Sequence, residues 1–275
     1  MDVKKLKKRT LFSAVWIVIA LLAVTSGTYA WFTFAPRTTV TPMYGTVTGG
    51  DGNLLISNSE NGSFDVSCEL TPVSGTKSLM PLTTGDLTGF FVVSGQAPTG
   101  IALKYSTAND RVDSTAVHGY VYLKAEDIAQ DICFDGSKLD FGTDGSVLAC
   151  LRLGLRFTTQ SGIKTYIFSL DEMGDTSRAE TRLTVPSAGT VVSGIYSGGD
   201  PIYISDPARP ISAFCASGTE DDLVRGRETL CRLNAEEVAQ VEYWLYLEGC
   251  DVNCINSVQS RDLALKLGFC GFSEN

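Results

Sequence analysis

Three stretches of the chain alternate apolar and polar residues with a period of two, the pattern of a β-strand that buries one face. They cover residues 148–157, 241–248 and 263–269. In the first stretch, one face carries only large apolar side chains: Leu151, Leu153, Leu155 and Phe157. A strand of this kind is stable only when its apolar face packs on another layer. Three of them in a chain of 275 residues therefore predict a mainly β fold.

The second and third stretches predict an antiparallel pair of strands, joined through the loop at residues 249–261. Within residues 241–248, one face consists of Val241, Tyr243, Leu245 and Leu247. The other face consists of Glu242, Trp244, Tyr246 and Glu248. Because Trp244 lies opposite the apolar set, we expect it either in a second core or exposed to a ligand.

Turn signals separate several shorter strands. Glycine occurs 27 times, and steps such as Asn61-Gly62 lie beside apolar runs, which is typical of hairpins. The further strands that we predict are residues 54–56, 64–66, 90–93, 120–123, 166–168 and 191–196. Two helices are predicted as lids over an open end of the sheets, at residues 125–131 and 223–238. A single β-sandwich with a few short helices accommodates all of these elements.

The first thirty residues predict export. A basic stretch from Lys4 to Arg9 precedes an apolar run at residues 11–24, and small residues then lead to Ala30. This order is typical of a secretory signal, with cleavage between Ala30 and Trp31. The alternative is an uncleaved membrane anchor, because residues 31–34 extend the apolar stretch. Residues 1–30 are therefore a signal peptide or anchor, and residues 31–275 form a single extracellular domain under either reading.

The charge of the exported part excludes one class of partner. The whole chain has a net charge of −9, and residues 1–30 contribute +4, so the remainder carries −13. A body this acidic repels phosphate backbones, and we expect no nucleic-acid partner.

Eight cysteines in an exported chain allow a disulfide framework, although 105 pairings are possible. We expect pairs that close local loops. These candidates are Cys133 with Cys150, Cys215 with Cys231, and Cys250 with Cys254. The alternative is that several cysteines are buried thiols. No Cys-x-x-Cys motif occurs and His118 is the single histidine, so a structural zinc site is not expected.

Few residues carry catalytic chemistry. Any serine or cysteine triad would have to use His118, and no nucleophile elbow accompanies it, so we interpret it as a surface or edge histidine. Glu248 and Asp251 are weak candidates for a Ca²⁺ site at a strand end. The alternative for them is capping of the amides of their own loop. No catalytic residue and no cofactor are predicted.

Two segments carry a family resemblance. The stretch Gly27-Thr28-Tyr29-Ala30-Trp31-Phe32 resembles the signal region of TasA/camelysin-like exported proteins of Gram-positive bacteria, which a SipW-type signal peptidase cleaves. Residues 244–254 are similar to the W-x-E-G-x-D-x-x-C ending of uncharacterised Firmicute surface proteins with such signals, with two extra residues between Trp244 and Glu248. The strand at residues 148–157 is also similar to one common in those proteins.

The resemblance implies a jelly-roll-like antiparallel β-sandwich displayed at the cell surface or in the extracellular biofilm matrix. It also implies self-association into fibres, with an N-terminal donor strand completing the sheet of the next subunit. By this resemblance, the donor residues in this chain are Trp31, Phe32, Thr33 and Phe34. We therefore expect a structural protein rather than an enzyme. The alternatives are an adhesin or glycan-binding module that uses Trp244, Tyr246 or Tyr196, and, less favoured, a secreted hydrolase that uses carboxylates.

Overall fold

The computed structural model describes residues 38–49, 54–75, 78–94, 103–142, 145–170, 194–196, 208–216, 228–251, 254 and 262–273. The chain divides into two compact units, Met1–Pro36 and Arg37–Asn275, and all described residues belong to the second. The predicted signal at residues 1–30 and the predicted donor residues 31–34 lie outside the described residues. No helix in the described part of the chain is long and apolar enough to cross a membrane.

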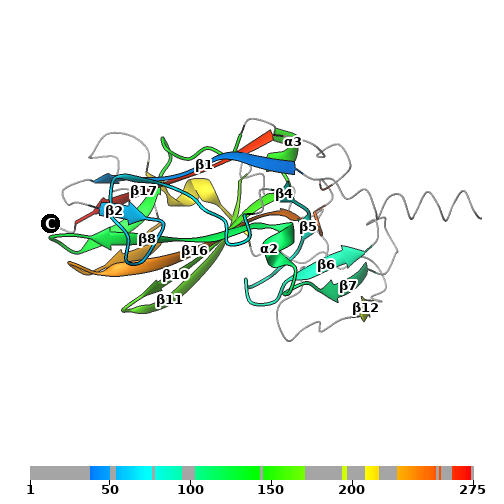
Figure 1. The fold of residues 1–275 in the computed structure, drawn as a ribbon. Helices are drawn as coiled ribbons and strands as arrows, with labels where there is room; N and C mark the ends of the chain where they lie inside the picture. The colour runs from blue at the N-terminus through cyan, green and yellow to red at the C-terminus, as the bar shows by residue number, and fades with distance from the viewer. Residues whose placement is uncertain are drawn as a thin grey trace, which may run out of the picture. The chain divides into compact units, whose positions relative to one another are not determined.

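The strands of this unit form two seven-stranded sheets and one three-stranded sheet (Figure 1). Sheet A has the order β14-β9-β17-β1-β3, with β15 beside β9 and β4 beside β1. Its strands are β1 (Thr38–Gly49), β3 (Ser67–Glu69), β4 (Ser78–Leu79), β9 (Gln130–Asp135), β14 (Cys215–Ala216), β15 (Cys231–Leu233) and β17 (Asp262–Phe272).

Sheet B has the order β13-β11-β10-β16-β8-β2, with β5 beside β16. Its strands are β2 (Leu54–Ser57), β5 (Pro81–Leu82), β8 (Val117–Ala125), β10 (Leu151–Thr159), β11 (Gly162–Ser169), β13 (Arg209–Pro210) and β16 (Val238–Glu248). The strands β2, β8, β16, β10 and β11 are antiparallel to their neighbours in this order.

Sheet C consists of β6 (Phe91–Ser94), β7 (Leu103–Thr107) and β12 (Gly194–Tyr196). The described helices are all single turns: α2 (Val112–Thr115), α3 (Gly145–Leu148) and the 3-10 helix η2 (Ile211–Phe214). The described structure is therefore mainly β, as the alternating stretches predict.

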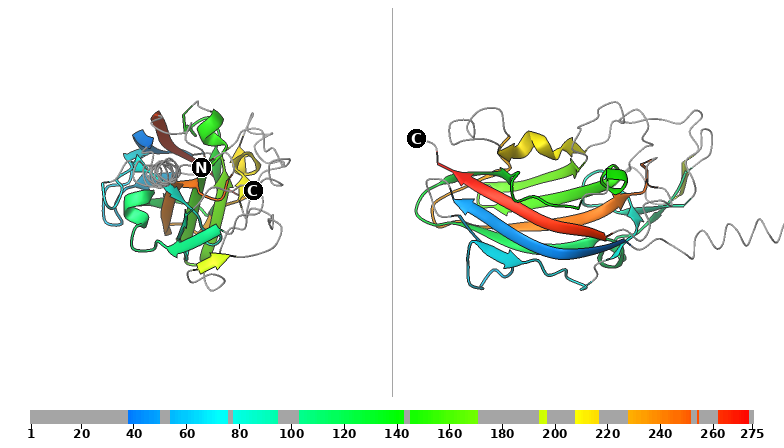
Figure 2. Two further views of the ribbon diagram at one scale, coloured as in Figure 1. Left: turned by 90° about the vertical axis from the view of Figure 1, so that its right-hand side faces the viewer. Right: turned by 90° about the horizontal axis from the view of Figure 1, so that it is seen from above.

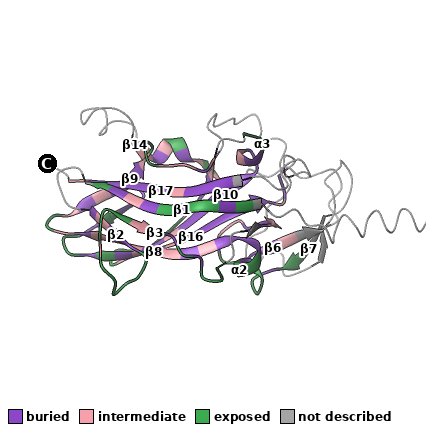
Figure 3. Cartoon of the chain, turned by 45° about the horizontal axis from the view of Figure 1, so that its top comes forward, coloured by how far each residue is buried: buried purple, intermediate pink, exposed green. Residues whose placement is uncertain are grey.

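Sheets A and B lie over one another and share the main core (Figure 2). The predicted apolar face of β10 is completely buried in this core, and so is that of β16. From sheet A, β17 contributes Leu263, Leu265, Leu267 and Phe269. Figure 3 shows the same alternation along β1, where buried and exposed residues follow one another. Period-two burial on two facing sheets is the arrangement of a sandwich.

The predicted pairing of the last two long strands is wrong. The strand β16 lies in sheet B between β10 and β8, whereas β17 lies in sheet A between β9 and β1. Leu245 and Leu265 are both fully buried in the main core, one from each sheet. The alternation predicts which face is buried but not which strand lies alongside, and two apolar faces can meet across a core as well as within one sheet.

The strand β1 begins the described chain and lies beside β17 in parallel, from Thr39 opposite Asp262 to Gly49 opposite Gly271. No strand was predicted here, although Thr38–Gly49 is rich in Thr and Val, which favour strands. A parallel pair inside sheet A departs from a purely antiparallel sandwich.

Both predicted helices are wrong in their described parts. Residues 125–131 contain the last residue of β8, a connection and the start of β9. Residues 228–238 contain β15 and the start of β16, while residues 223–227 are not described. Cys231 and Leu233 are buried in the core and pair with β9. Tertiary pairing has overridden the local preference of these short segments.

Candidate functional site

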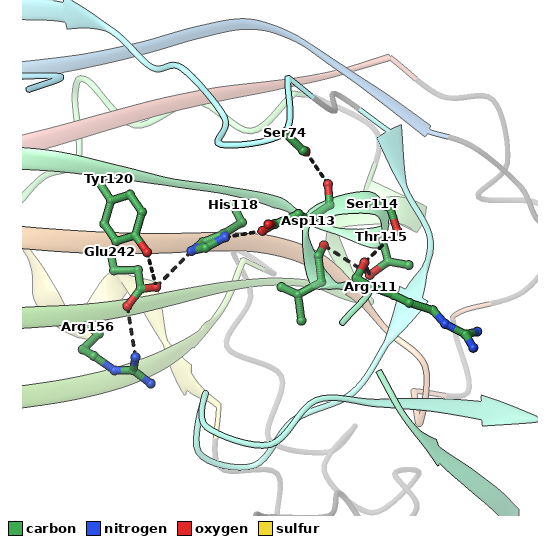
Figure 4. A network of polar contacts seen from close by, with 10 residues as sticks. Ser74, Arg111, Asp113, Ser114, Thr115, His118, Tyr120, Arg156 and Glu242 are labelled. Carbon is green, nitrogen blue, oxygen red and sulfur yellow. Dashed lines mark hydrogen bonds and ion pairs between the residues drawn. The ribbon is translucent and has the colours of Figure 1, made fainter. Parts of the chain in front are cut away.

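A network of polar side chains surrounds His118, on the face of sheet B that points away from the main core (Figure 4). The ring nitrogen Nδ1 of His118 lies 2.6 Å from Oδ1 of Asp113, and Nε2 lies 2.9 Å from Oε1 of Glu242. Tyr120 donates its hydroxyl to the same Glu242 oxygen at 3.0 Å, and Arg156 donates Nη1 to the other oxygen at 3.0 Å. We call these five residues the His118 network.

Strand register brings the members of the network together. Tyr120 of β8 lies opposite Glu242 of β16, and Glu242 lies opposite Arg156 of β10. All three therefore face outward in one row across adjacent strands. His118 lies two residues before Tyr120, on the same face, and Asp113 reaches it from the helix α2.

Both contacts of His118 are made to carboxylate oxygens, which only accept hydrogen bonds. A neutral imidazole has one N–H, so it can donate only one of the two bonds, whereas an imidazolium donates both. Burial by itself lowers the pKa of His118, but the hydrogen bonds to Glu242 and Asp113 outweigh it, and the pKa is raised. Burial likewise favours neutral Glu242, but its bonds with His118 and Tyr120 outweigh this and lower its pKa.

The partners of His118 in this network are carboxylates rather than a serine or cysteine nucleophile. In the described structure both ring nitrogens of His118 contact carboxylates, so the ring is not in position to activate a serine or cysteine. His118 also stacks on Trp244, with ring centroids 5.1 Å apart, and Arg156 lies over the same indole at 5.1 Å. The network therefore ties α2 to sheet B and covers the indole of Trp244.

The His118 network predicts a pH-dependent stability. A raised folded-state pKa of His118 stabilises the fold fully below the ordinary value of 6.5, and this contribution is lost as the pH rises through the folded value. The lowered pKa of Glu242 stabilises the fold fully above the ordinary value of 4.5. This contribution is lost as the pH falls through the folded-state pKa. We expect the urea midpoint to fall between pH 6 and pH 8, and the fall to be smaller in His118→Gln. An equal fall in both proteins would contradict this role.

The two weak Ca²⁺ candidates lie at a second, buried polar cluster. Asp251 accepts a bond of 2.8 Å from Nη2 of Arg152, and both side chains are fully buried. Glu248 accepts the backbone N–H of Cys250 at 2.9 Å, which is the loop-capping role, and burial raises its pKa. A guanidinium beside Asp251 already supplies the positive charge that a cation would bring. In the described residues, no three His, Cys, Asp or Glu side chains are arranged to hold a metal ion.

All eight cysteines are described, and no disulfide joins any of them. Cys133 lies in β9 of sheet A, whereas Cys150 directly precedes β10 of sheet B. Cys254 contacts Cys150, and a hydrogen bond between these two side chains, together with burial, raises the pKa of Cys254. Cys215 and Cys231 lie in β14 and β15, and both strands pair with β9. The pairing expected from the loops therefore stays a prediction.

Two of the three aromatic residues proposed for ligand binding, Trp244 and Tyr246, are buried. Trp244 is 3% exposed and Tyr246 is fully buried, in a second apolar cluster that also contains Leu82, Leu87, Phe90, Ala108, Val112, Ala116 and Ile167. Trp244 therefore lies in a second core, one of the two places that its position in the strand allowed. The side chain of Tyr196 lies outside the described part of the structure.

Among the residues that the structure describes, no strand pairs with the outer edge of β11 before Phe168. On one side, β11 pairs with β10 from Gly162 to Ser169. On the other side, its pairing within the described residues is limited to Phe168 and Ser169, which pair with β13. The residues from Gly162 to Thr165 are exposed, and Ile163 is 67% exposed.

The chain matches no protein-family model, and no curated protein or solved structure matches it.

The side chains that contact His118 and Asp251 were not predicted from the sequence. The sequence contains one indication of the contacts around His118. Polar or amphipathic residues occupy outward positions of three predicted strands: Tyr120, Glu242 and Arg156. Their register, and hence their contact, could not be predicted. The partners Arg152 and Asp251 are 99 residues apart in sequence, and no local pattern links them.

Proposed function

We propose that this chain is an exported, non-enzymatic structural protein of the cell surface or biofilm matrix, which assembles by strand addition between copies. The signal or anchor helix at residues 1–30, its removal by a SipW-type peptidase, and a jelly-roll-like sandwich are parts of this proposal. The observation that carries it is the outer edge of β11 before Phe168, with which no described strand pairs.

An unpaired strand edge offers a row of backbone donors and acceptors to any extended peptide, and β-augmentation uses such edges for specific binding. Proteins usually protect long edges with charge, proline or a covering element. The exposed part of β11 carries one charge, Lys164, beside the exposed apolar side chain of Ile163. This edge supports its use as an acceptor.

The donor in this proposal is the segment from Trp31 to Phe34 of a second copy. Its sequence, Trp-Phe-Thr-Phe, consists of strand-forming residues that are poorly suited to water. A segment of four residues matches the length of the exposed part of β11. The net charge of −13 outside residues 1–30 disfavours random association between copies, which makes a specific edge contact more important.

Electron microscopy tests this proposal. We expect fibres from a chain that begins at Trp31 and monomers from a chain that begins at Arg37. Within the longer chain, Ile163→Lys places a charge at the acceptor edge and is expected to abolish or strongly reduce fibres. Val73→Lys is the matched control, since Val73 is 55% exposed and lies outside β11. Monomers from every chain, or equal fibres from both starting points, would contradict strand addition.

A second candidate is a glycan-binding module on the outer face of sheet B. The observation that favours it is the row of partly exposed polar and aromatic side chains from β8, β16 and β10: Tyr120, Tyr122, Gln240, Glu242 and Arg156. Sugar binding that is lost in Tyr122→Ala, in a protein that forms no fibres, would favour this candidate over the first.

A further inference from the structure

Two of the eight cysteines lie directly opposite one another in neighbouring strands. Cys133 of β9 and Cys270 of β17 are register partners in an antiparallel pair. Together with Phe272 they form a small apolar cluster of their own, apart from the main core. The Sγ atom of Cys270 lies 3.8 Å from the backbone oxygen of Cys133.

This placement satisfies the backbone geometry of a disulfide. Directly opposed residues of an antiparallel pair have Cα atoms about 4.5–5.5 Å apart, and their side chains leave the sheet on the same face. Disulfides are found at Cα separations of about 4.4–6.8 Å. Neither strand must therefore move for the two sulfur atoms to bond.

We propose that Cys133 and Cys270 form a disulfide when the chain folds in an oxidising compartment. The proposal rests on export for its physiological setting, but its chemistry is independent of fibre formation. The oxidant is a disulfide, either of a small molecule or of a thiol oxidoreductase.

The electrons and protons of this reaction balance. One cysteine thiolate attacks the oxidant's disulfide and forms a mixed disulfide, releasing one thiolate. The second cysteine thiolate then attacks the protein sulfur of the mixed disulfide, and the remaining half of the oxidant leaves. In total, two cysteine thiols lose two protons and two electrons, and the oxidant is reduced to two thiols.

Access to the two sulfur atoms depends on the state of the chain. Cys133 is 2% exposed and Cys270 is 5% exposed, so the finished fold shields both. The pair lies near the end of β17, which finishes at Phe272, and such ends open more readily than the middle of a sheet. The bond therefore forms during folding, or when the end of β17 opens.

The bond would link strands that are far apart in the sequence. Cys133 and Cys270 are separated by 137 positions, so the cross-link closes a loop that includes β10, β11, β13 and β16 of sheet B. Cross-links across long loops restrict the unfolded chain most. Cys231 of β15, a strand that also pairs with β9, lies in the main core rather than in this cluster.

Peptide mapping tests the proposal. The full-length chain is purified with reductant, unfolded, and refolded with mixed reduced and oxidised glutathione. Remaining thiols are alkylated in denaturant before trypsin digestion. Cys133 and Cys270 lie on separate tryptic peptides, residues 125–138 and 267–275. We expect mass spectrometry to find these two peptides joined, and to find them separate after reduction.

Stability supplies a second readout. We expect the urea midpoint of the oxidised protein to exceed that of the reduced protein by about 1 M. Cys270→Ser should remove this difference, whereas Cys68→Ser, a partly buried cysteine of β3, should retain it. Separate alkylated peptides, or Cys133 joined to Cys150 or Cys215, would overturn the proposal. Because the map is made on the unmutated chain, it decides the question even if Cys270→Ser fails to fold.

Discussion

Replacing Asp251 with alanine is expected to lower the free energy of unfolding by about 3–5 kcal/mol. The carboxylate lies 2.8 Å from Nη2 of Arg152, and both side chains are fully buried. The guanidinium is held in place by the backbone, since Nη1 donates to the carbonyl oxygens of Ala149 at 3.1 Å and Leu151 at 2.8 Å. Without Asp251, the buried guanidinium keeps its bonds to the two carbonyl oxygens but loses this carboxylate. Burial raises the pKa of the neighbouring Glu248, which makes it a poor replacement anion.

Urea unfolding of two further variants separates this cause from general damage. The double variant Arg152→Met, Asp251→Leu removes both charges, and it is expected to recover most of the lost stability. The matched exposed pair is Arg209 with Glu228, whose side chains are 48% and 47% exposed. Glu228→Ala is expected to cost less than about 1 kcal/mol. Equal losses in Asp251→Ala and Glu228→Ala would contradict the assigned role of the buried pair.

The buried faces of the long strands could be predicted, because positions that face the core carry apolar residues. Leu153, Leu155 and Phe157 alternate with other residues, and all three are fully buried. In β16 the same reasoning placed Leu245 in the core and Trp244 on the opposite side. These predictions require only the period of the strand, which is a local property of the chain.

Neighbour relations could not be predicted, because they depend on contacts between distant segments. The strands β16 and β17 are consecutive in sequence but lie in different sheets. Arg152 alternates with the apolar residues of β10, a pattern that indicates a solvent-facing position, but it is fully buried against Asp251. A single sequence contains the residues of such a pair without the information that they meet.

The contacts within the His118 network could not be predicted for the same reason. The interpretation of His118 as an edge histidine beside a strand was a statement about local context. Its two carboxylate partners come from α2, five residues before it, and from β16, 124 residues after it. The nearer contact depends on the turn at Val112–Thr115, and the farther one depends on the register of β8 with β16. Both arise only when the chain is folded.

Replacing Trp244 with alanine is expected to cost about 3–5 kcal/mol of stability, because a large ring is removed from the second core. The indole is 3% exposed, and the ring of Phe90 lies 5.9 Å from it. It also supports the stacked ring of His118 and the guanidinium of Arg156. A cavity at this position would therefore weaken the packing of the second core and the His118 network together. Urea unfolding measures the loss.

The same experiment distinguishes a core tryptophan from a binding platform. A ligand-binding tryptophan on a surface can be replaced with little effect on folding, usually within about 0.5 kcal/mol. Val73→Ala, at a side chain that is 55% exposed, sets that reference in this protein. If Trp244→Ala unfolds at the same urea concentration as Val73→Ala but loses glycan binding, the indole serves a ligand and its burial in the second core is wrong. A large loss of stability instead removes Trp244 from the candidate sugar-binding residues and leaves the partly exposed row that contains Tyr120 and Tyr122 as the candidate.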